Sequence, residues 1–181
     1  INMSVRRLKD MFLEEGLKEL NSKGILDFSL RRISANLDVS CAAPYKYFEN
    51  KEAFVSEIVV YAKERWAKKI EKIVSSTRST EEKALGILKD YLAFLTLNPY
   101  IRSVLIGRDP SLDTIMTPSV KELFEEYRIK RNLSKKEMDI KLFSVFSIIY
   151  GTSIMIDLTD PDLRDQVSLK AITLLTDELA K

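Results

Sequence analysis

The stretch SLRRISANLDVSCAAPYKYFENK (residues 29–51) carries the signals of a helix-turn-helix. Ser29 is a favourable helix cap for the short segment that follows it. In that segment Leu30, Ile33 and Leu37 recur at the spacing that places apolar side chains on one face of a helix. The stretch therefore predicts a short helix whose inner face packs on a core.

The residues after this helix turn the chain and start another one. A turn at residues 38–39 is followed by Ser40, which can cap a third short helix that reaches about Phe48. If Ser40 is the N-cap, Pro44 is the fourth helical residue and forfeits a single backbone hydrogen bond. Alternatively the regular helix begins at Pro44, with Ala43 in the cap position.

The outer face of the third helix has a composition that suits DNA. A helix of two or three turns fits the major groove, and the helix before it braces it from behind. Residues 40–43 are small, Tyr45 and Tyr47 offer hydroxyls, Lys46 adds charge, and Phe48 can turn back to the core. Further cations could extend the footprint onto phosphates, although each of them alone is more often a solvated surface charge: Arg6, Arg7, Lys9, Arg31, Arg32 and Lys51.

The composition excludes several classes of function. The chain has 181 residues, 45% hydrophobic and 31% charged, which is typical of a soluble folded protein. It has no histidine and one cysteine, which excludes His-dependent catalysis, His-ligated metal sites and an intramolecular disulfide. We expect a cytoplasmic protein that is not an enzyme and needs no cofactor or metal.

No segment predicts a membrane span. The longest uncharged run covers residues 142–156, which is short against the roughly 20 residues that a span needs. We expect this run to be a helix buried on most sides. The N-terminus is polar, so it does not resemble a signal peptide. Charge is uneven along the chain: residues 1–78 carry a net +4 and residues 79–181 a net −2, which favours a polyanionic partner for the front.

The rest of the chain predicts further helices and no strand of useful length. Gly24 ends the first helix, and Asn50 caps the fourth. Thr80 is the predicted cap of the next helix, and later helices start at Thr117-Pro118, at the capping box of residues 134–137 and at residues 160–161. We predict an all-α chain of about nine helices. A helix-turn-helix domain covers residues 1–50 and extends into the start of the fourth helix, and a helical ligand-binding and dimerisation domain covers residues 51–181.

The segment of residues 17–54 resembles the DNA-binding domain of TetR-type (TetR/AcrR) transcriptional regulators. The matching residues, which follow without gaps, are Gly24, Ser29, Ile33-Ser-Ala35, Val39-Ser40, Tyr45, Tyr47-Phe48 and Lys51-Glu52. The chain differs from the family where Asp38 replaces a common glycine and Pro44 a common Leu or Ile. Asp tolerates the left-handed conformation better than most residues, so we expect the turn to survive.

The resemblance implies a regulator, most often a repressor, that binds a palindromic operator in double-stranded DNA as a homodimer and is released by a small inducer. It implies phosphate contacts from Ser29, Tyr45, Tyr47 and Lys51, and base contacts from residues 41–44. With the cations and small residues named above, the candidate DNA-binding residues are Ser29, Arg31, Ser40, Cys41, Ala42, Ala43, Pro44, Tyr45, Lys46, Tyr47 and Lys51.

The last two helices are candidates for the dimer interface. Ser144, Ser147 and Gly151 are spaced three and four apart, and small residues at that spacing permit close approach of two helices. The last helix is amphipathic. We expect both helices to pair with those of a second copy, since two-fold homodimers are the commonest oligomers; the alternative is that both complete a monomer core. The residues proposed for the interface are Ser144, Ser147, Gly151, Ala171, Leu174 and Leu175.

The aromatic residues of the body are candidates for the ligand pocket, although aromatics at helical spacing more often pack in a core. They are Trp66, Phe94, Phe124, Tyr127, Phe143, Phe146 and Tyr150. Such a lining predicts an apolar or aromatic inducer. The absence of histidine argues against a His-anchored metal–drug chelate.

Two other interpretations remain open. Cys41, in the first turn of the third helix, could act as a redox switch, or it could simply be a small residue against a base. The helix-turn-helix could also bind another protein instead of DNA. A helical enzyme is the weakest alternative, because no paired acid and base or metal-ligand set stands out.

Overall fold

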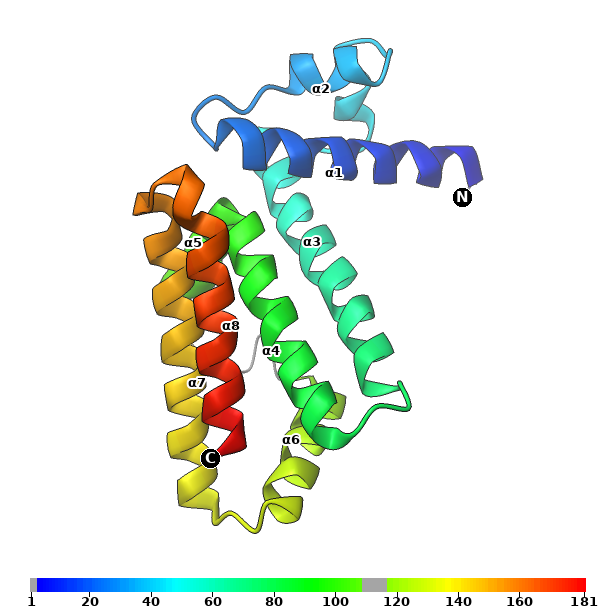
Figure 1. Cartoon of the computed structure of the whole chain (residues 1–181). Helices are drawn as coiled ribbons and strands as arrows, with labels where there is room; N and C mark the ends of the chain where they lie inside the picture. Colours follow the sequence, from blue (N-terminus) through cyan, green and yellow to red (C-terminus); the bar gives the residue numbers. More distant parts are fainter. Residues whose placement is uncertain (1–2, 109–116) are drawn as a thin grey trace. The chain divides into compact units, whose positions relative to one another are not determined.

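A computed structural model describes residues 3–108 and 117–181, and this part of the chain is helical without a strand, as predicted (Figure 1). It holds eight α-helices and three short 3-10 helices, against about nine helices predicted. The α-helices are α1 (Met3–Lys23), α2 (Leu30–Asn36), α3 (Lys51–Val74), α4 (Thr80–Leu97), α5 (Pro99–Arg108), α6 (Pro118–Lys130), α7 (Lys135–Met155) and α8 (Arg164–Ala180). The 3-10 helices are η1 (Pro44–Lys46), η3 (Ile156–Leu158) and η4 (Pro161–Leu163).

Most of the helix boundaries lie where the sequence placed a cap. Ser29 accepts the backbone N–H of Arg32, Asn50 accepts that of Ala53, and Ser134 forms the predicted capping box with Glu137. The start of α4 needs a correction, because its cap is Ser79 and not Thr80. Ser79 forms a second capping box with Glu82, and this pairing satisfies two backbone donors where Thr80 would satisfy one.

The chain divides into two compact units, which we call the head and the body. The head consists of the residues up to Ala67 together with Pro99–Ile101; the body consists of Lys68–Asn98 and Arg102–Lys181. The helix α3 contributes to both. The functional boundary predicted at residue 50 stays a prediction.

The head is built on an aromatic core. Phe48 and Phe54 stack with ring centroids 4.2 Å apart, and Phe12 meets Phe48 edge to face. Gly16 lets α1 approach α3 closely, because a Cβ at this position would lie 2.6 Å from a methyl carbon of Ile58. The core therefore holds α1 against α3 and leaves α2 and η1 to complete the head.

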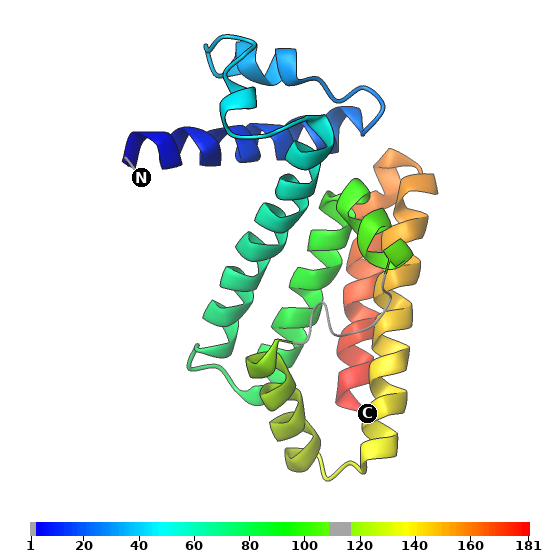
Figure 2. The ribbon, with the colours of Figure 1, turned by 180° about the vertical axis from the view of Figure 1, so that it is seen from behind.

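The body is organised around α4. This helix contacts α6, α7 and α8, and it lies between α6 and the α7–α8 pair in Figure 2. Its apolar face, which includes Leu88, Tyr91 and Leu95, is buried. A buried arginine, Arg102, donates to the carbonyl oxygen of Ser153 and to the carboxylate of Asp157, and so ties α5 to the end of α7.

Three side chains hold the C-terminal end of α8. The ammonium of Lys141 donates to the carbonyl oxygen of Glu178 at 2.6 Å, and the hydroxyl of Tyr127 donates to that of Leu179 at 2.5 Å. Arg131 donates to the carbonyl oxygen of Ala180. The last carbonyls of a helix have no partner within the helix, so these donors satisfy groups that would otherwise need water. Burial lowers the pKa of Lys141 and raises the pKa of Tyr127.

The helix α7 is less buried than we expected from its sequence. Together with η3 it is the one helix of the described residues that is long and apolar enough to cross a membrane, and about a third of its most apolar window is buried. Four of its exposed apolar residues follow at intervals of 3, 11 and 4 positions, which places them on one helical face, and we call them the stripe: Ile140, Phe143, Ile154 and Leu158. The expectation of burial on most sides was wrong, because α4 and α8 cover other faces of α7 and leave this one open.

Candidate nucleic-acid interface

The turn between α2 and η1 has the conformation that the sequence predicted. Asp38 adopts a φ of +53°, in the left-handed region, and its backbone N–H donates to Ala35 at 3.1 Å. The N–H of Val39 then donates to the carbonyl of Ser34 at 3.0 Å. These two bonds end α2 and direct the chain toward η1.

The third helix is shorter than its sequence suggested. No regular α-helix starts at Ser40; the segment makes a turn in which the N–H of Ala43 donates to the carbonyl of Ser40 at 2.9 Å. The helix begins at Pro44, with Ala43 in the cap position, as in the second of the two predicted arrangements. The reason is that an α-helix from residue 41 would need an N–H at Pro44, which proline does not have.

The exposed tip of the head is formed by residues on both sides of this proline. Ser40, Cys41, Ala42, Tyr45 and Lys46 are exposed, with Tyr45 58% accessible. Ser29, Tyr47 and Lys51 are half-buried. We define Ser40–Ala42 together with Tyr45 and Lys46 as the tip.

The predicted base contacts of Ala43 and Pro44 need correction. Both residues are buried, and Ala43 belongs to the core of the head. Buried side chains have little surface to offer a base edge. The start of η1 is therefore held in the head by buried residues, and the residues exposed to a DNA partner lie on either side of it in the sequence.

The two arginines of α2 have different surroundings. The guanidinium of Arg32 donates to the buried carboxylate of Glu19 at 2.8 Å and to the carbonyl of Asp27, so it joins α2 to α1 and to the turn between them. Arg31 is exposed and has no hydrogen-bond or ion-pair partner within the described residues. Arg32 is therefore removed from the predicted phosphate contacts, whereas Arg31 remains free to make one. No pattern in the sequence indicated the role of Glu19.

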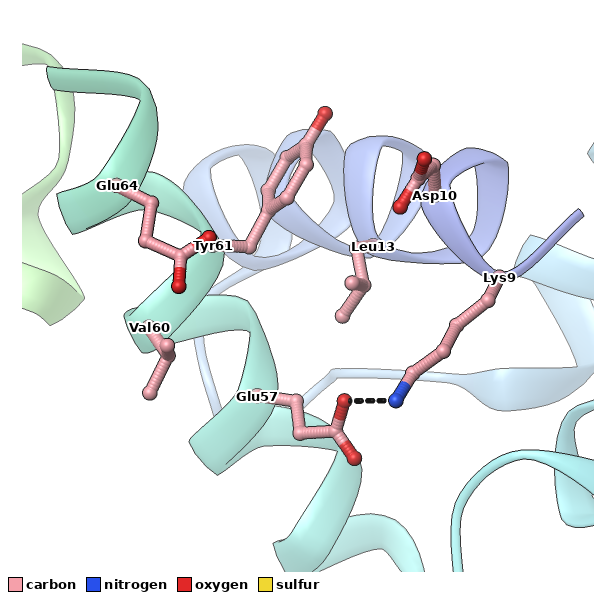
Figure 3. A pocket seen from close by; sticks show the side chains of 7 residues that line it. All are labelled: Lys9, Asp10, Leu13, Glu57, Val60, Tyr61 and Glu64. Carbon is pink, nitrogen blue, oxygen red and sulfur yellow. Dashed lines mark ion pairs between the residues drawn. The ribbon is translucent and has the colours of Figure 1, made fainter. Parts of the chain in front are cut away.

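A second side of the head is acidic. A hollow of about 280 Å³ lies between α1 and α3, and the carboxylates of Asp10, Glu57 and Glu64 line it (Figure 3). The ammonium of Lys9 forms an ion pair with the carboxylate of Glu57 in this hollow, at 2.6 Å. This side would repel phosphate, so the predicted phosphate contact of Lys9 is corrected. Arg7 is exposed, and the side chain of Arg6 lies outside the described part of the chain.

Comparisons with known proteins are consistent with a helix-turn-helix in the head. No family model matches the sequence. The chain is 27% identical over 124 residues to the probable HTH-type transcriptional regulator YttP of Bacillus subtilis, a match that covers 67% of this chain and only 58% of that protein. A TetR transcription regulator from Haloarcula marismortui is 17% identical and superposes over 97% of each chain with a TM-score of 0.71.

The chain has the TetR/AcrR fold. A TetR variant from Acinetobacter baumannii in complex with minocycline shares it, at 16% identity and a TM-score of 0.59, over 95% of this chain and 94% of that one. The TetR/AcrR fold explains the order of elements: a three-helix head that ends in α3, then a helical body. It confirms the fold that the helix-turn-helix residues predicted.

The body of this TetR/AcrR fold does not gather the seven predicted pocket residues into one lining. Phe124, Tyr127 and Phe146 are buried, and Phe94 and Tyr150 are half-buried. Phe143 is 74% exposed, which corrects its assignment, because it lies on the open side of α7. Trp66 belongs to the head unit.

A tyrosine that the sequence analysis passed over lies at the centre of the aromatic group. The ring of Tyr91 meets those of Phe146 and Tyr150 at 6.3 and 6.2 Å, and its hydroxyl lies 3.3 Å from that of Tyr150. Burial raises the pKa of Tyr91 well above its ordinary value. Its spacing from Leu88 and Leu95, three and four residues, was the signal that could have identified it as a core residue.

The predicted dimer residues fall into two groups. Ser147, Gly151 and Leu174 are exposed, and Ser144 is half-buried. Ala171 and Leu175 are buried inside the body, so they belong to its own core and not to an open face. The spacing of small residues pointed to the open side of α7, but it missed the large apolar residues of the stripe on the same side.

Proposed function

We propose that the protein is a ligand-responsive transcriptional regulator that binds a palindromic DNA operator as a homodimer and represses until a small effector releases it. The observation that supports this most strongly is the exposed tip, on a head with the TetR/AcrR fold that also carries Arg31, an exposed arginine with no partner within the described residues. The tip combines small residues, which can approach bases closely, with hydroxyl groups and cations, which can bind phosphates.

The tip suggests a division of contacts. Cys41 and Ala42 are small and exposed, and fit against a base edge or a thymine methyl. Hydroxyls and cations around them fit phosphate oxygens, and they come from Ser29, Arg31, Ser40, Tyr45, Lys46, Tyr47 and Lys51. Most protein–DNA hydrogen bonds go to phosphate and sugar, so the latter group supplies affinity while the former supplies sequence preference.

The stripe on α7 supports a homodimer. Monomeric proteins seldom leave a large continuous apolar surface open to water. On this stripe Phe143 and Leu158 are 74% and 78% exposed, and the small residues Ser147 and Gly151 lie between them. A second copy of α7 would cover these residues, and small residues at its centre allow two helices to approach. Dimerisation would also fix the separation of the two heads on an operator.

Control by an effector follows from differential affinity. A ligand that binds the body better in one conformation shifts the population toward it, and operator affinity changes by the same coupling free energy. A neighbour with this fold is in complex with minocycline, which supports a small-molecule effector for this chain. The aromatic group around Tyr91 favours an apolar or aromatic effector.

The test is a selection from random duplex DNA followed by a salt titration. We expect a palindromic sequence to be enriched and its affinity to fall steeply as salt rises, because bound phosphates release counterions. A Lys46→Gln variant should bind more weakly with a smaller salt dependence. If no sequence is enriched and binding is insensitive to salt, the proposal is wrong, and a protein partner for the helix-turn-helix becomes the better interpretation.

A further inference from the structure

A groove in the body is separate from the aromatic group around Tyr91. It has a volume of about 300 Å³ and lies between α4 and α8, with η3 also contributing to its lining. The helices α4 and α8 run antiparallel (Figure 1), so the end of α4 meets the start of α8. All of its lining residues belong to the body.

The lining is mostly apolar. Leu92 and Ile156 are buried, and Ala93 and Ile172 continue the apolar surface along α4 and α8. Leu97, the last residue of α4, is 70% exposed at this groove. A ligand with an apolar body would remove this surface from water, which is favourable.

The charges of the groove are separated along its length. Lys89 lies eight residues before Leu97, about 12 Å along α4, and has no ion-pair partner within the described residues. The carboxylates lie toward the Leu97 end. There Asp157 is paired with the buried Arg102, and Asp165 is in the first turn of α8, where the helix dipole stabilises a negative charge.

Two further groups affect which ligand fits. Arg164 lies against the carbonyls of Thr159 and Asp157, at 3.3 and 3.5 Å, and has no carboxylate partner in the described residues. Ser168 is half-buried on the α8 side, and its hydroxyl has no hydrogen-bond partner among the residues that the structure describes, whereas Thr173 and Thr176 bond back to their own helix. With Asp157 paired with Arg102, the lining is left with two cations, Lys89 and Arg164, against the single carboxylate of Asp165, so the groove favours an anion.

We infer that this groove binds a small amphipathic monocarboxylate. The carboxylate is held by Lys89, and the apolar part lies along Leu92, Ala93 and Ile172 toward Leu97. The volume is at the small end of ligand sites, which limits the apolar part to a short chain or a single ring. The binding itself does not depend on DNA; its use as an effector signal rests on the proposed function.

Calorimetric titration with octanoate, octylammonium and octanol tests the inference. We expect saturable binding of octanoate, weaker binding of octanol and none of octylammonium. Lys89→Met should weaken octanoate binding roughly tenfold, because a charge-assisted hydrogen bond is lost. Lys83→Met, a half-buried lysine of the same helix outside the groove, should bind octanoate as the unaltered protein does.

A second variant tests the apolar wall. Leu97→Asp changes an exposed residue, so circular dichroism should show an intact fold while octanoate binding weakens. The inference is overturned if octanoate does not saturate, if octylammonium binds as well, or if Lys89→Met and Lys83→Met behave alike. Binding of the selected DNA is measured on the same samples. If the protein binds DNA but not octanoate, only the inference about the groove is contradicted. If it binds octanoate but not DNA, only the proposed regulator function is contradicted.

Discussion

At the scale of single residues, Arg31 and Arg32 show how neighbours with the same side chain differ in their roles. Arg32 is committed to Glu19 and to the carbonyl of Asp27, whereas Arg31 is exposed and unpaired within the described residues. An arginine held by a carboxylate contributes to the head, and a free one is available to a phosphate.

The two arginines should therefore respond differently to substitution. Arg31→Gln should weaken DNA binding and reduce the slope of log affinity against log salt by about one, with little change in melting temperature. Arg32→Gln should lower the melting temperature, because Glu19 is left buried without its partner, and should leave the slope unchanged. Salt titrations and thermal melts measure both. Equal loss of slope in the two variants would contradict the assignment.

A second prediction concerns Lys141, whose pKa is lowered by burial. Below the lowered pKa the folded and unfolded states both carry the charge, and burial of this charge reduces stability. Between the lowered pKa and the ordinary value near 10.4, the unfolded chain keeps a proton that the folded state has lost, so stability rises with pH.

Substitution of Lys141 isolates this effect. Relative to Lys141→Met, the unaltered protein should become more stable as the pH rises from neutral into that alkaline range. Urea unfolding at a series of pH values measures it. Lys136→Met, an exposed lysine of the same helix, should keep the pH dependence of the unaltered protein. An unchanged slope in Lys141→Met would show that the lysine is not buried as described.

At the scale of secondary-structure elements, caps decide where α7 begins. The hydroxyl of Ser134 accepts the N–H of Glu137 at 3.2 Å, and the carboxylate of Glu137 accepts the N–H of Ser134 at 2.7 Å. Ser134→Ala should lower the free energy of unfolding by about 1 kcal/mol. Ser134→Asp, which can still cap, should lower it much less. Urea unfolding compares the two, and equal losses would mean that the cap does not stabilise α7.

Pro44 sets the start of η1 in a similar way. Its ring fixes a backbone angle that suits the first residue of the helix and supplies no N–H to the Ser40 carbonyl. Pro44→Ala should lower stability by about 0.4–1 kcal/mol, because the unfolded chain gains freedom. It should also change the DNA sequence selected, because Cys41 and Ala42 lie in the turn that leads into the proline. If Pro44→Ala selects the same DNA sequence as the unaltered protein, Pro44 does not affect which bases are preferred.

At the scale of the whole molecule, the stripe on α7 decides the oligomeric state that we propose. Phe143→Glu places a charge on a residue that is 74% exposed, so the fold should persist while a dimer dissociates. Analytical ultracentrifugation at micromolar concentration should show a monomer with unchanged helicity and weaker DNA binding. Ile129→Glu, a matched change on α6 at 64% exposure, should remain a dimer. If the unaltered protein is a monomer at this concentration, the proposal of a homodimer is wrong.

The head was predictable in outline because its signals are local. Caps at Ser29 and Asn50, the left-handed turn at Asp38 and the apolar spacing of α2 depend on residues a few positions apart. The same locality explains the errors. At the start of α4, Ser79 and Thr80 are neighbouring candidates for the cap, and at the third helix Ser40 and Ala43 are alternative caps around Pro44. Sequence alone did not decide between these alternatives.

The sequence by itself determined the helices, the helix-turn-helix and the uneven charge, since each follows from the chemistry of nearby residues. Only the tertiary structure decided which side chains remain available. It buried Ala43 and Pro44, bound Arg32 to Glu19 and Lys9 to Glu57, and left Phe143 open to solvent. The physical reason is that burial and ion pairing depend on residues far apart in the chain, which come together only when the helices pack.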